Sequence, residues 1–452
     1  MNSNLSVGYA RIDITPTESV PLCGYGNSQT RMSQGVLDPL YATCIAFSDA
    51  QGSTLVLYTL DLLLSPATVW PKVVEAVSQA HGIDPNGIIM SSTHTHSGPD
   101  CNQVLCPSSL RYAEQLTQWL IQAANEALAD RKPAAMETAR FDSDPINHVR
   151  HYVLENGTYA GPNFGDFTAS PIKDHVTEAD RQIQLIRITR ENGKGILMAN
   201  WQCHPYCSSS SAAAYGREHR YELSADFIAG CRQFMEENTD LQFAFFQGGG
   251  GNLSPCDRIN PTLVPENHLE VGRWLGKCML NGMDQLKPVA GGKVAAKGMM
   301  FHGKVDHTED HLLPQAQEIY EVWIAENDKD KCIAMGKPYG INSAWHAMSI
   351  RLRSKMPEYL DMNIGAAVVG DIGFGFLPYE PFDTNCVQIK EASPMETTFV
   401  LGYANGYFNY VPSKLGFSYS CYETNSCKHV PGTGEAVAES VVDMLQQLQN
   451  QE

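Results

Sequence analysis

The sequence predicts an α/β fold in which mixed β-sheets are flanked by helices. Apolar residues make up 43% of the 452 residues and charged residues 18%, which is typical of a globular enzyme with a large core. Strand-like and helix-like runs alternate through the first half of the chain, and such alternation predicts layers of helix against sheet. No repeat, low-complexity tract or Pro/Ser-rich linker interrupts the pattern, so we expect residues 1–452 to form a single domain.

The individual elements follow from the spacing of apolar residues. Strands are expected where short apolar runs are bounded by turn residues: 7–14, 41–47, 55–62, 87–92, 182–189, 195–201, 242–246, 363–369 and 372–377. Helices are expected where longer runs have helical spacing: 68–81, 108–129, 225–238, 266–285 and 435–448. Residues 142–180 are rich in Asp, Asn, Gly, Pro and His and are expected to form a long loop or lid. Residues 303–360 show the least clear pattern and are expected to contain helix mixed with other structure.

Charge and cysteine content limit the class of protein. The formal net charge of −18 argues against a nucleic-acid partner and against strong adhesion to anionic membranes, because both attract an excess of Lys and Arg. No apolar stretch is long enough to cross a bilayer, and the N-terminus carries no signal peptide. The 13 cysteines are dispersed without a disulfide spacing, so we expect reduced thiols and a cytoplasmic location. No pattern indicates an oligomeric state.

Two histidines follow the apolar run 87–90, in the segment SSTHTHSGP. His94 and His96 are two residues apart, and on an extended strand both side chains would point to the same face. The Gly-Pro pair that follows ends the strand. A pair of imidazoles at a strand end is typical of a divalent metal site that admits a substrate. The alternative is that the histidines only hydrogen-bond the strand end.

A third histidine follows the strand expected over 195–201. His204, in the segment NWQCHP, repeats the arrangement seen at His94 and is a candidate third imidazole. A purely structural role at the strand end is the alternative. Cys203 and Cys207 flank it, but a Cys/His zinc site built on them lacks a fourth ligand nearby, so we disfavour that site.

A glycine run follows the next expected strand, in the segment FFQGGGGNLSP. Four glycines let the backbone turn sharply or approach a ligand closely. The segment is not a P-loop, because no GK[ST] follows, and it is not a GxSxG nucleophile elbow. Ser254 at its end is a candidate nucleophile, a hydrogen-bond donor to a substrate, or a cap.

Two further polar segments lie in the last quarter of the chain. Glu380, in the segment FLPYEPF, is a candidate metal ligand, general base or helix cap. Tyr410 closes the segment GYANGYFNY, and Tyr419 and Tyr422 follow it. Tyrosines gathered in a loop rich in Gly and Asn favour a binding site over a core.

In this order, the five segments resemble the neutral ceramidases, a family of zinc-dependent amidases that act on N-acyl sphingosines. The resemblance runs from Gly8 to about Glu423. Its most specific motifs are THTHSGP at Thr93–Pro99, NWxxH at Asn200–His204, GNLSP at Gly251–Pro255 and GYANxY at Gly402–Tyr407. The resemblance implies a neutral-ceramidase-like catalytic domain and a Zn²⁺ cofactor.

The resemblance also implies roles for individual residues. By position, the zinc ligands would be His94, His204, Glu380 and Tyr410. His96 would lie just behind the ligands, Ser254 would be the active-site serine, and Tyr422 would stabilise the oxyanion. The family also has an INRSP segment whose arginine points into the site. Here the corresponding residues read INHVR, so Arg150 and His148 are both candidates for that position.

The implied chemistry is hydrolysis of an amide by a water molecule that the metal activates. Zinc with an open position lowers the pKa of bound water and polarises the carbonyl. We expect His96 to carry the proton to the leaving amine, because Glu380 is occupied as a ligand. Asp61 and Asp226 are candidates for orienting the ligand imidazoles, and capping of a strand or helix is the alternative.

The substrate class is broader than ceramide. No leader and no C-terminal immunoglobulin-like domain are recognised, and both are expected of ceramidases that act outside cells. We therefore expect a small-molecule N-acyl or lipid substrate, either ceramide-like or smaller. Two other readings are a serine esterase or lipid hydrolase that uses Ser254, and a non-catalytic relative that only binds a ligand. Mixed His, Glu and Tyr ligation suits zinc or iron.

Overall fold

The computed structural model describes residues 4–102, 104–210, 214–260 and 267–450. A nine-stranded sheet, with the strand order β14-β12-β11-β6-β1-β3-β4-β5 and β16 paired with β6, is built from residues 5–289. The bounds are β1 (Leu5–Asp13), β3 (Tyr41–Asp49), β4 (Thr54–Leu60), β5 (Ile88–Ser92), β6 (Lys132–Asp142), β11 (Gln182–Arg190), β12 (Gly195–Trp201), β14 (Leu241–Gln247) and β16 (Lys287–Val289). Two neighbouring pairs, β4–β5 and β12–β14, are parallel.

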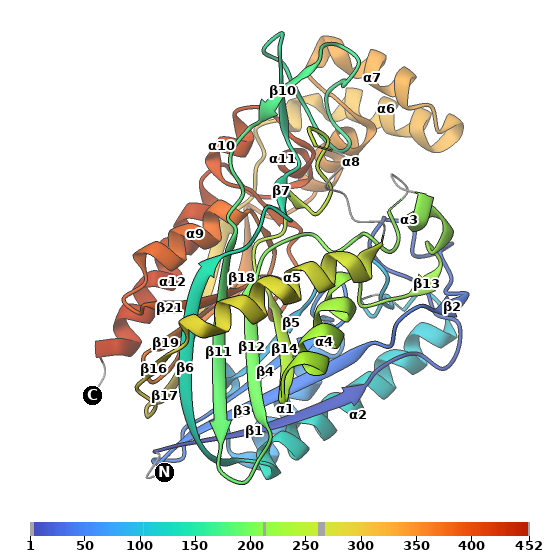
Figure 1. Ribbon diagram of the computed structural model, residues 1–452. Helices are drawn as coiled ribbons and strands as arrows, with labels where there is room; N and C mark the ends of the chain where they lie inside the picture. Colours follow the sequence, from blue (N-terminus) through green and yellow to red (C-terminus); the bar gives the residue numbers. More distant parts are fainter. Residues whose placement is uncertain (1–3, 103, 211–213, 261–266, 451–452) are drawn as a thin grey trace.

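The sheet bends so that its two ends approach each other. Strands β1 and β6 pair only at Ser6–Pro133 and Val7–Lys132, so a short junction joins the two halves of the sheet. The Thr59 hydroxyl on β4 donates to the carbonyl of Phe245 on β14 at 2.6 Å. The carboxyl ends of β5, β12 and β14 are thereby brought to one side of the sheet, the side that faces upward in Figure 1.

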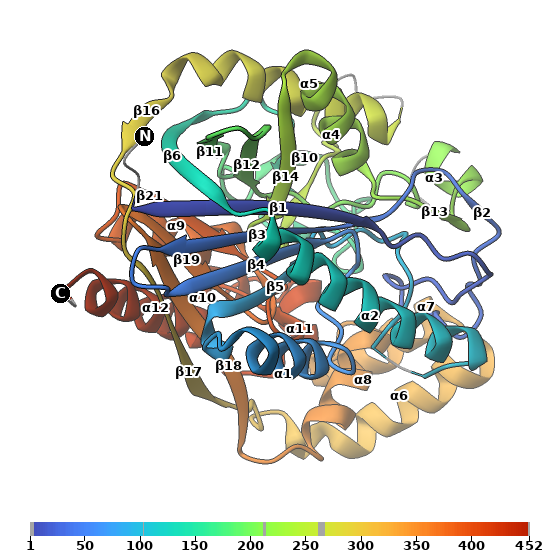
Figure 2. The ribbon, with the colours of Figure 1, turned by 90° about the horizontal axis from the view of Figure 1, so that it is seen from below.

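Helices cover the outer faces of both halves, because each helix has one apolar side that must be buried. Helices α1 (Trp70–His81) and α2 (Pro107–Ala129) pack on the half made of β1, β3, β4 and β5. Helices α4 (Phe227–Asn238) and α5 (His268–Gly282) pack on the half made of β6, β11, β12 and β14. Figure 2 shows the two helix pairs on opposite sides of the strands.

A second, four-stranded sheet packs against the inner face of the first. Its order is β17 (Val294–Lys304), β18 (Tyr359–Val369), β19 (Ile372–Phe376) and β21 (Thr397–Leu401), with β19 and β21 parallel. Aromatic contacts join the sheets: the ring of Phe374 lies 6.5 Å from that of Phe47, and Phe399 lies 6.4 Å from Phe246. Helices α9 (Asp383–Ala392) and α12 (Thr433–Asn450) cover the other face.

Two insertions stand over the carboxyl ends of the strands (Figure 1). The first contains β7 (His148–Val149), β8 (Tyr152–Leu154), β9 (Tyr159–Ala160) and β10 (Ile172–His175). The second contains α6 (Leu313–Glu326), α7 (Lys329–Gly336) and α8 (Ala344–Arg353), which enclose a small core of their own. The remaining short elements are β2 (Gly35–Val36), α3 (Ala214–Glu218), β13 (Glu222–Leu223), β15 (Leu253–Ser254), β20 (Glu380–Pro381), β22 (Tyr410–Val411), α10 (Lys414–Phe417) and α11 (Tyr422–Ser426).

The expected fold class, α/β with mixed sheets flanked by helices, is confirmed. The expected strands and helices agree with the structure to within a few residues at most boundaries. Among the longer elements, β6, β17, β21 and α9 had no counterpart among the expectations, and neither did most of the short strands and helices. The segment 142–180 is not a plain loop, because its short strands pair with one another and with β15. Residue 266, expected to open a helix, lies outside the described residues, and α5 begins at His268.

None of the helices among the described residues is both long and apolar enough to cross a membrane. All 13 cysteines have free thiols, as the dispersed spacing predicts.

Candidate active site

The five polar segments meet in one cavity of about 1040 Å³. They follow the carboxyl ends of β5, β12, β14, β19 and β21, each of which runs parallel to a neighbouring strand. Open α/β sheets bind ligands at such ends. All eight residues expected at the site line this cavity: His94, His96, Arg150, His204, Ser254, Glu380, Tyr410 and Tyr422. The structure therefore brings together every residue of the expected set.

The histidine pair reaches the cavity in a way that differs from the expectation. Strand β5 ends at Ser92, and His94 has a φ of 68°, in the left-handed region. This conformation costs a non-glycine residue roughly 1 kcal/mol. The rings of His94 and His96 lie 5.1 Å apart and nearly perpendicular, at 84°. The two side chains converge through a strained loop, and the expectation of an extended strand over both histidines was wrong.

Backbone carbonyls determine which ring nitrogen carries the proton in His94 and His204. Nδ1 of His94 donates to the carbonyl of Leu63 at 2.7 Å, and Nδ1 of His204 donates to that of Gly250 at 2.9 Å. A carbonyl oxygen can only accept, so in each neutral ring Nε2 keeps its lone pair. This is how metal-ligating histidines are commonly held.

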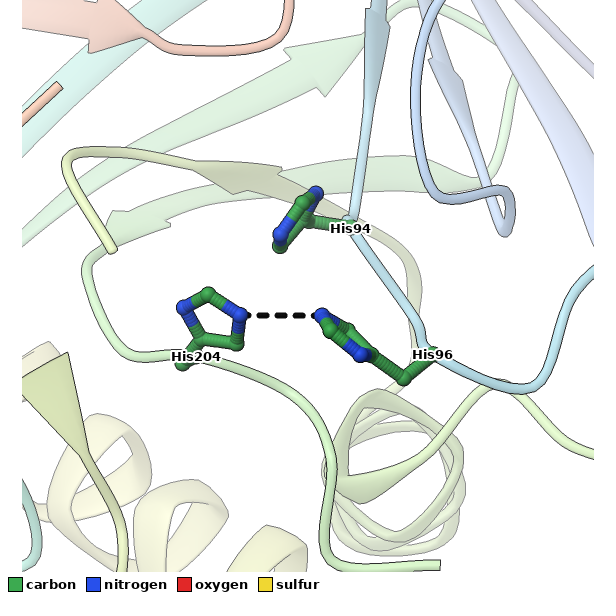
Figure 3. Close-up of side chains that lie close together, drawn as sticks. All are labelled: His94, His96 and His204. Carbon is green, nitrogen blue, oxygen red and sulfur yellow. Dashed lines mark hydrogen bonds between the residues drawn. The ribbon is translucent and has the colours of Figure 1, made fainter. Parts of the chain in front are cut away.

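The third imidazole completes a compact group (Figure 3). Nε2 of His96 lies 2.9 Å from Nε2 of His204, and the ligand atoms of the three histidines all lie within 4.8 Å of one another. Burial, followed by the nearby cationic side chains and imidazoles, lowers the pKa of His96 and His204 well below the usual value. His96 can therefore either bind a metal itself or donate from Nε2 to His204.

Glu380 completes the group. Its Oε2 lies 3.1 Å from Nε2 of His94, and the two side chains are only 4% and 1% exposed. Neither atom has a hydrogen-bond partner among the residues that the structure describes. Two buried acceptors at this distance need a cation between them or an added proton. The donor set, two imidazoles and a carboxylate, fits a divalent metal ion.

Two tyrosines hold this arrangement, and the sequence analysis assigned neither a role. Tyr407 donates to Oε1 of Glu380 at 2.5 Å, which turns Oε2 toward the histidines. The ring of Tyr403 stacks on His94 at 4.0 Å. Both lie in the segment GYANGYFNY, so the tyrosine-rich composition was a signal for them.

Tyr410 and Tyr422 also line the cavity. Tyr410 is the register partner of Glu380 in the parallel pair β20–β22. Its ring lies 5.8 Å from that of Tyr422. Burial, reinforced by the charge of Glu380, raises the pKa of Tyr410 well above its usual value and that of Tyr422 to about 12. Tyr422 is thus protonated at neutral pH and able to donate a hydrogen bond.

Of the two candidates Arg150 and His148, Arg150 is the one that lines the cavity. The backbone N–H of Arg150 donates to the carbonyl of Asn252 at 2.9 Å, next to the β7–β15 pair. Its guanidinium pairs with Glu423 at 2.5 Å and lies 3.4 Å from the Tyr410 hydroxyl. His148 does not line the cavity. The pairing partner Glu423 is fully buried and was not expected from the sequence.

Ser254 lies at the cavity wall without a histidine partner. Its hydroxyl donates to the carbonyl of Cys256 at 3.0 Å and accepts from the Tyr206 hydroxyl at 2.6 Å. The backbone N–H of Cys256 also donates to it. This is a turn-capping arrangement, and it leaves the serine without the imidazole base that a nucleophilic serine needs.

The two aspartates do not orient the imidazoles. Both carboxylate oxygens of Asp61 accept from Arg232 at 2.8 Å. Asp226 caps α4 by accepting from the backbone N–H of Phe227 at 2.9 Å. The expectation of an orienting role is wrong for both, and their structural role holds. No group of potential metal ligands among the described residues includes Cys203 or Cys207.

Cationic side chains gather along the cavity lining. Four of them are Arg220, Arg258, Lys329 and Lys428. Among the described residues, none of these four forms an ion pair with a carboxylate. Arg220 instead stacks on Tyr25, and Arg258 stacks on Phe167. They leave positive charge at the cavity of a protein whose net charge is −18.

Comparison with known proteins finds similarity in the fold and none in the sequence searches. No family model matches the sequence, and no curated protein matches it. The neutral ceramidase from Pseudomonas aeruginosa superimposes with a TM-score of 0.72 at 17% identity, over 99% of this chain and 75% of that one. A structure described as ceramidase complexed with C2 superimposes with a TM-score of 0.71 at 18% identity, over 99% and 76%. The resemblance expected from the motifs is therefore confirmed as a shared fold.

Proposed function

We propose that the protein is a zinc-dependent amidohydrolase that cleaves an N-acyl amide bond. One observation carries the proposal. Inside a large cavity, Nε2 of His94 lies 3.1 Å from Oε2 of Glu380 and its ring lies 4.7 Å from that of His204, and Oε2 has no hydrogen-bond partner among the described residues. The fold shared with neutral ceramidases supports the same class of reaction.

The residues that would hold the zinc are His94, His204, Glu380 and Tyr410, with His96 as an alternative imidazole. The chemistry that zinc supplies when bound is Lewis-acid chemistry, which activates water near neutral pH and polarises an amide carbonyl. Neutral histidines are the form that binds a metal, and the lowered pKa of His204 supplies it.

The other residues of the cavity have complementary tasks. Tyr422 keeps its proton and can donate it in a hydrogen bond to the oxygen that becomes negative. His96 is neutral, so it can accept a proton and pass it to a leaving amine. Arg150 keeps its charge close to Tyr410 because Glu423 pairs with it. Ser254 fits a group that positions the substrate, because its hydroxyl has no histidine base.

The lining of the cavity supports a particular kind of N-acyl substrate. A volume of about 1040 Å³ has room for an acyl chain and a head group. Four cations that form no ion pair within the described part of the chain line it. Such a surface attracts an anion, and it favours an N-acyl compound that carries a carboxylate or a phosphate over a neutral ceramide-like lipid.

Zinc content and hydrolysis test the proposal together. Zinc per chain is measured by elemental analysis in the wild type, His94→Ala and His204→Ala, alongside release of acid from a panel of N-acyl amides. We expect each variant to lose about one equivalent of zinc and nearly all activity. His302→Ala is the matched control, because that side chain is 68% exposed and pairs only with Asp361.

The opposite results contradict the proposal in separate ways. If His94→Ala keeps the zinc content and the activity of the wild type, the proposed metal site is wrong. Inactivation by a fluorophosphonate, abolished by Ser254→Ala and insensitive to chelators, would instead assign the reaction to a serine esterase. Bound zinc and bound ligand without any product would identify a binding protein.

A further inference from the structure

A second group of potential metal ligands lies beside the cavity, outside the set described above. His148, His175 and Asp257 each offer one ligand atom, and these atoms all lie within 4.8 Å of one another. They come from three separate places in the chain. His148 lies on β7, His175 ends β10, and Asp257 follows the Ser254 turn. In the β7–β15 pair, His148 is the register partner of Ser254.

The protonation of His175 follows from its hydrogen bond. Its Nδ1 lies 2.6 Å from the carbonyl of Val149, which can only accept, so Nδ1 carries the proton. In the neutral ring Nε2 therefore keeps a lone pair, and this atom lies 3.2 Å from Oδ1 of Asp257. Two acceptors face each other, as Nε2 of His94 and Oε2 of Glu380 do in the main site. A cation between them, or a second proton on His175, resolves the repulsion.

The surroundings favour the cation. The other carboxylate oxygen of Asp257, Oδ2, lies 3.9 Å from Nδ1 of His148, so the carboxylate faces both imidazoles. The rings of His148 and His175 stack 5.8 Å apart at 15°. Their side chains are 9% and 17% exposed and that of Asp257 is 8% exposed, which leaves little water to solvate an ion pair.

We propose that His148, His175 and Asp257 bind a second divalent transition-metal ion, with zinc the best match, and that a water molecule completes its coordination. Two imidazoles and one carboxylate from three segments are a common donor set for this class of ion. The side chains need to close by about an ångström to reach metal–ligand distances near 2.0–2.2 Å.

A metal at this position would hold the cavity wall together. It would join β10 and β7 of the insertion over residues 142–180 to the turn that carries Ser254. Arg150 is two residues from His148, so the same ion would fix the segment that presents the guanidinium to Tyr410. The ion would thus act on the position of Ser254 and Arg150 without touching the substrate.

Elemental analysis of the full-length protein, loaded with zinc and then desalted, tests this site apart from the main one. We expect about two zinc ions per chain in the wild type, about one in His175→Ala, about one in His94→Ala and none in the double variant. Asp257→Asn, which keeps the shape of the side chain, should also retain about one. His302→Ala is again the matched control and keeps both.

A second measurement, of thermal unfolding, tests the site even if some of these variants fold poorly. In the His94→Ala protein, which keeps His175 and Asp257, added zinc should raise the unfolding temperature, and adding His175→Ala should abolish that rise. A His94→Ala protein that binds no zinc, with one zinc in His175→Ala, overturns the second site and leaves the proposed function intact. Two zinc ions in both His94→Ala and His175→Ala overturn both assignments.

Discussion

The buried carboxylate of Glu423 allows a quantitative prediction. Burial alone would raise its pKa, but the charges of His151 and Arg150 outweigh burial and lower the pKa to about 2, from the usual value of 4.5. The difference of about 2.5 pKa units, at 1.36 kcal/mol per unit, corresponds to about 3 kcal/mol of stability at pH 7. Because the folded pKa is the lower one, this contribution is complete above pH 4.5 and is lost as the pH falls toward 2.

The perturbation is Glu423→Gln, which keeps the shape of the side chain and removes its charge. Arg150 then stays buried without a counter-charge. We expect the free energy of unfolding to fall by about 3 kcal/mol at pH 7, and the gap between variant and wild type to narrow to about 2 kcal/mol at pH 3.5. Urea denaturation of both proteins at the two pH values, followed by fluorescence, measures the gap.

The control is Glu396→Gln. That side chain is 80% exposed and lies 3.8 Å from Arg140, so its removal should change stability by about 0.5 kcal/mol or less at either pH. Equal stability of Glu423→Gln and the wild type at pH 7 would refute the reasoning. A gap that stays constant between the two pH values would also refute it, because Glu423 would then not be the group that titrates.

Three further predictions concern the cavity. Gly24→Ala places a Cβ 2.8 Å from Nδ1 of His96 and should lower kcat at least about tenfold in steady-state kinetics. Gly52→Ala is the control, because Gly52 also has a positive φ but has open space around it, and its kcat should not change. Equal effects of the two substitutions would show that contact with His96 is not the cause. Tyr422→Phe should lower kcat by about 10²-fold with unchanged zinc content; full activity would exclude it as the oxyanion donor. Arg220→Gln should raise KM about tenfold for N-acyl substrates that carry a carboxylate and not for neutral ones, and an equal change for both would contradict the anionic substrate.

The site residues could be predicted because the motifs are local. The chemistry-bearing side chains follow strand ends within a few residues, as His204 follows β12, so short segments identify them. Their geometry could not be predicted from spacing. The left-handed φ of His94 depends on hydrogen bonds from Thr93 and His94 to the carbonyls of Leu60 and Leu62, which the strand pattern does not reveal.

The residues that the sequence analysis missed are those selected by tertiary pairing. Glu423 follows Arg150 by 273 residues in the sequence and meets it only in the folded structure. Strand β6 was missed for a local reason. It pairs with β1, β11 and β16, but three of its residues are alanines, Ala134, Ala135 and Ala139, and alanine is depleted in strands, so the segment gives a weak strand signal.

The way the histidines are held decides how the site responds to mutation. The sequence analysis expected carboxylates to orient the imidazoles, but the carbonyls of Leu63 and Gly250 perform that task. A side-chain substitution cannot remove a carbonyl, so the proton stays on Nδ1 whatever residue occupies position 63. Asp61 instead pairs with Arg232 and accepts from the backbone N–H of Tyr41. Asp61→Asn should therefore weaken folding and leave zinc bound in the chains that fold, which separates stability from metal affinity in this protein.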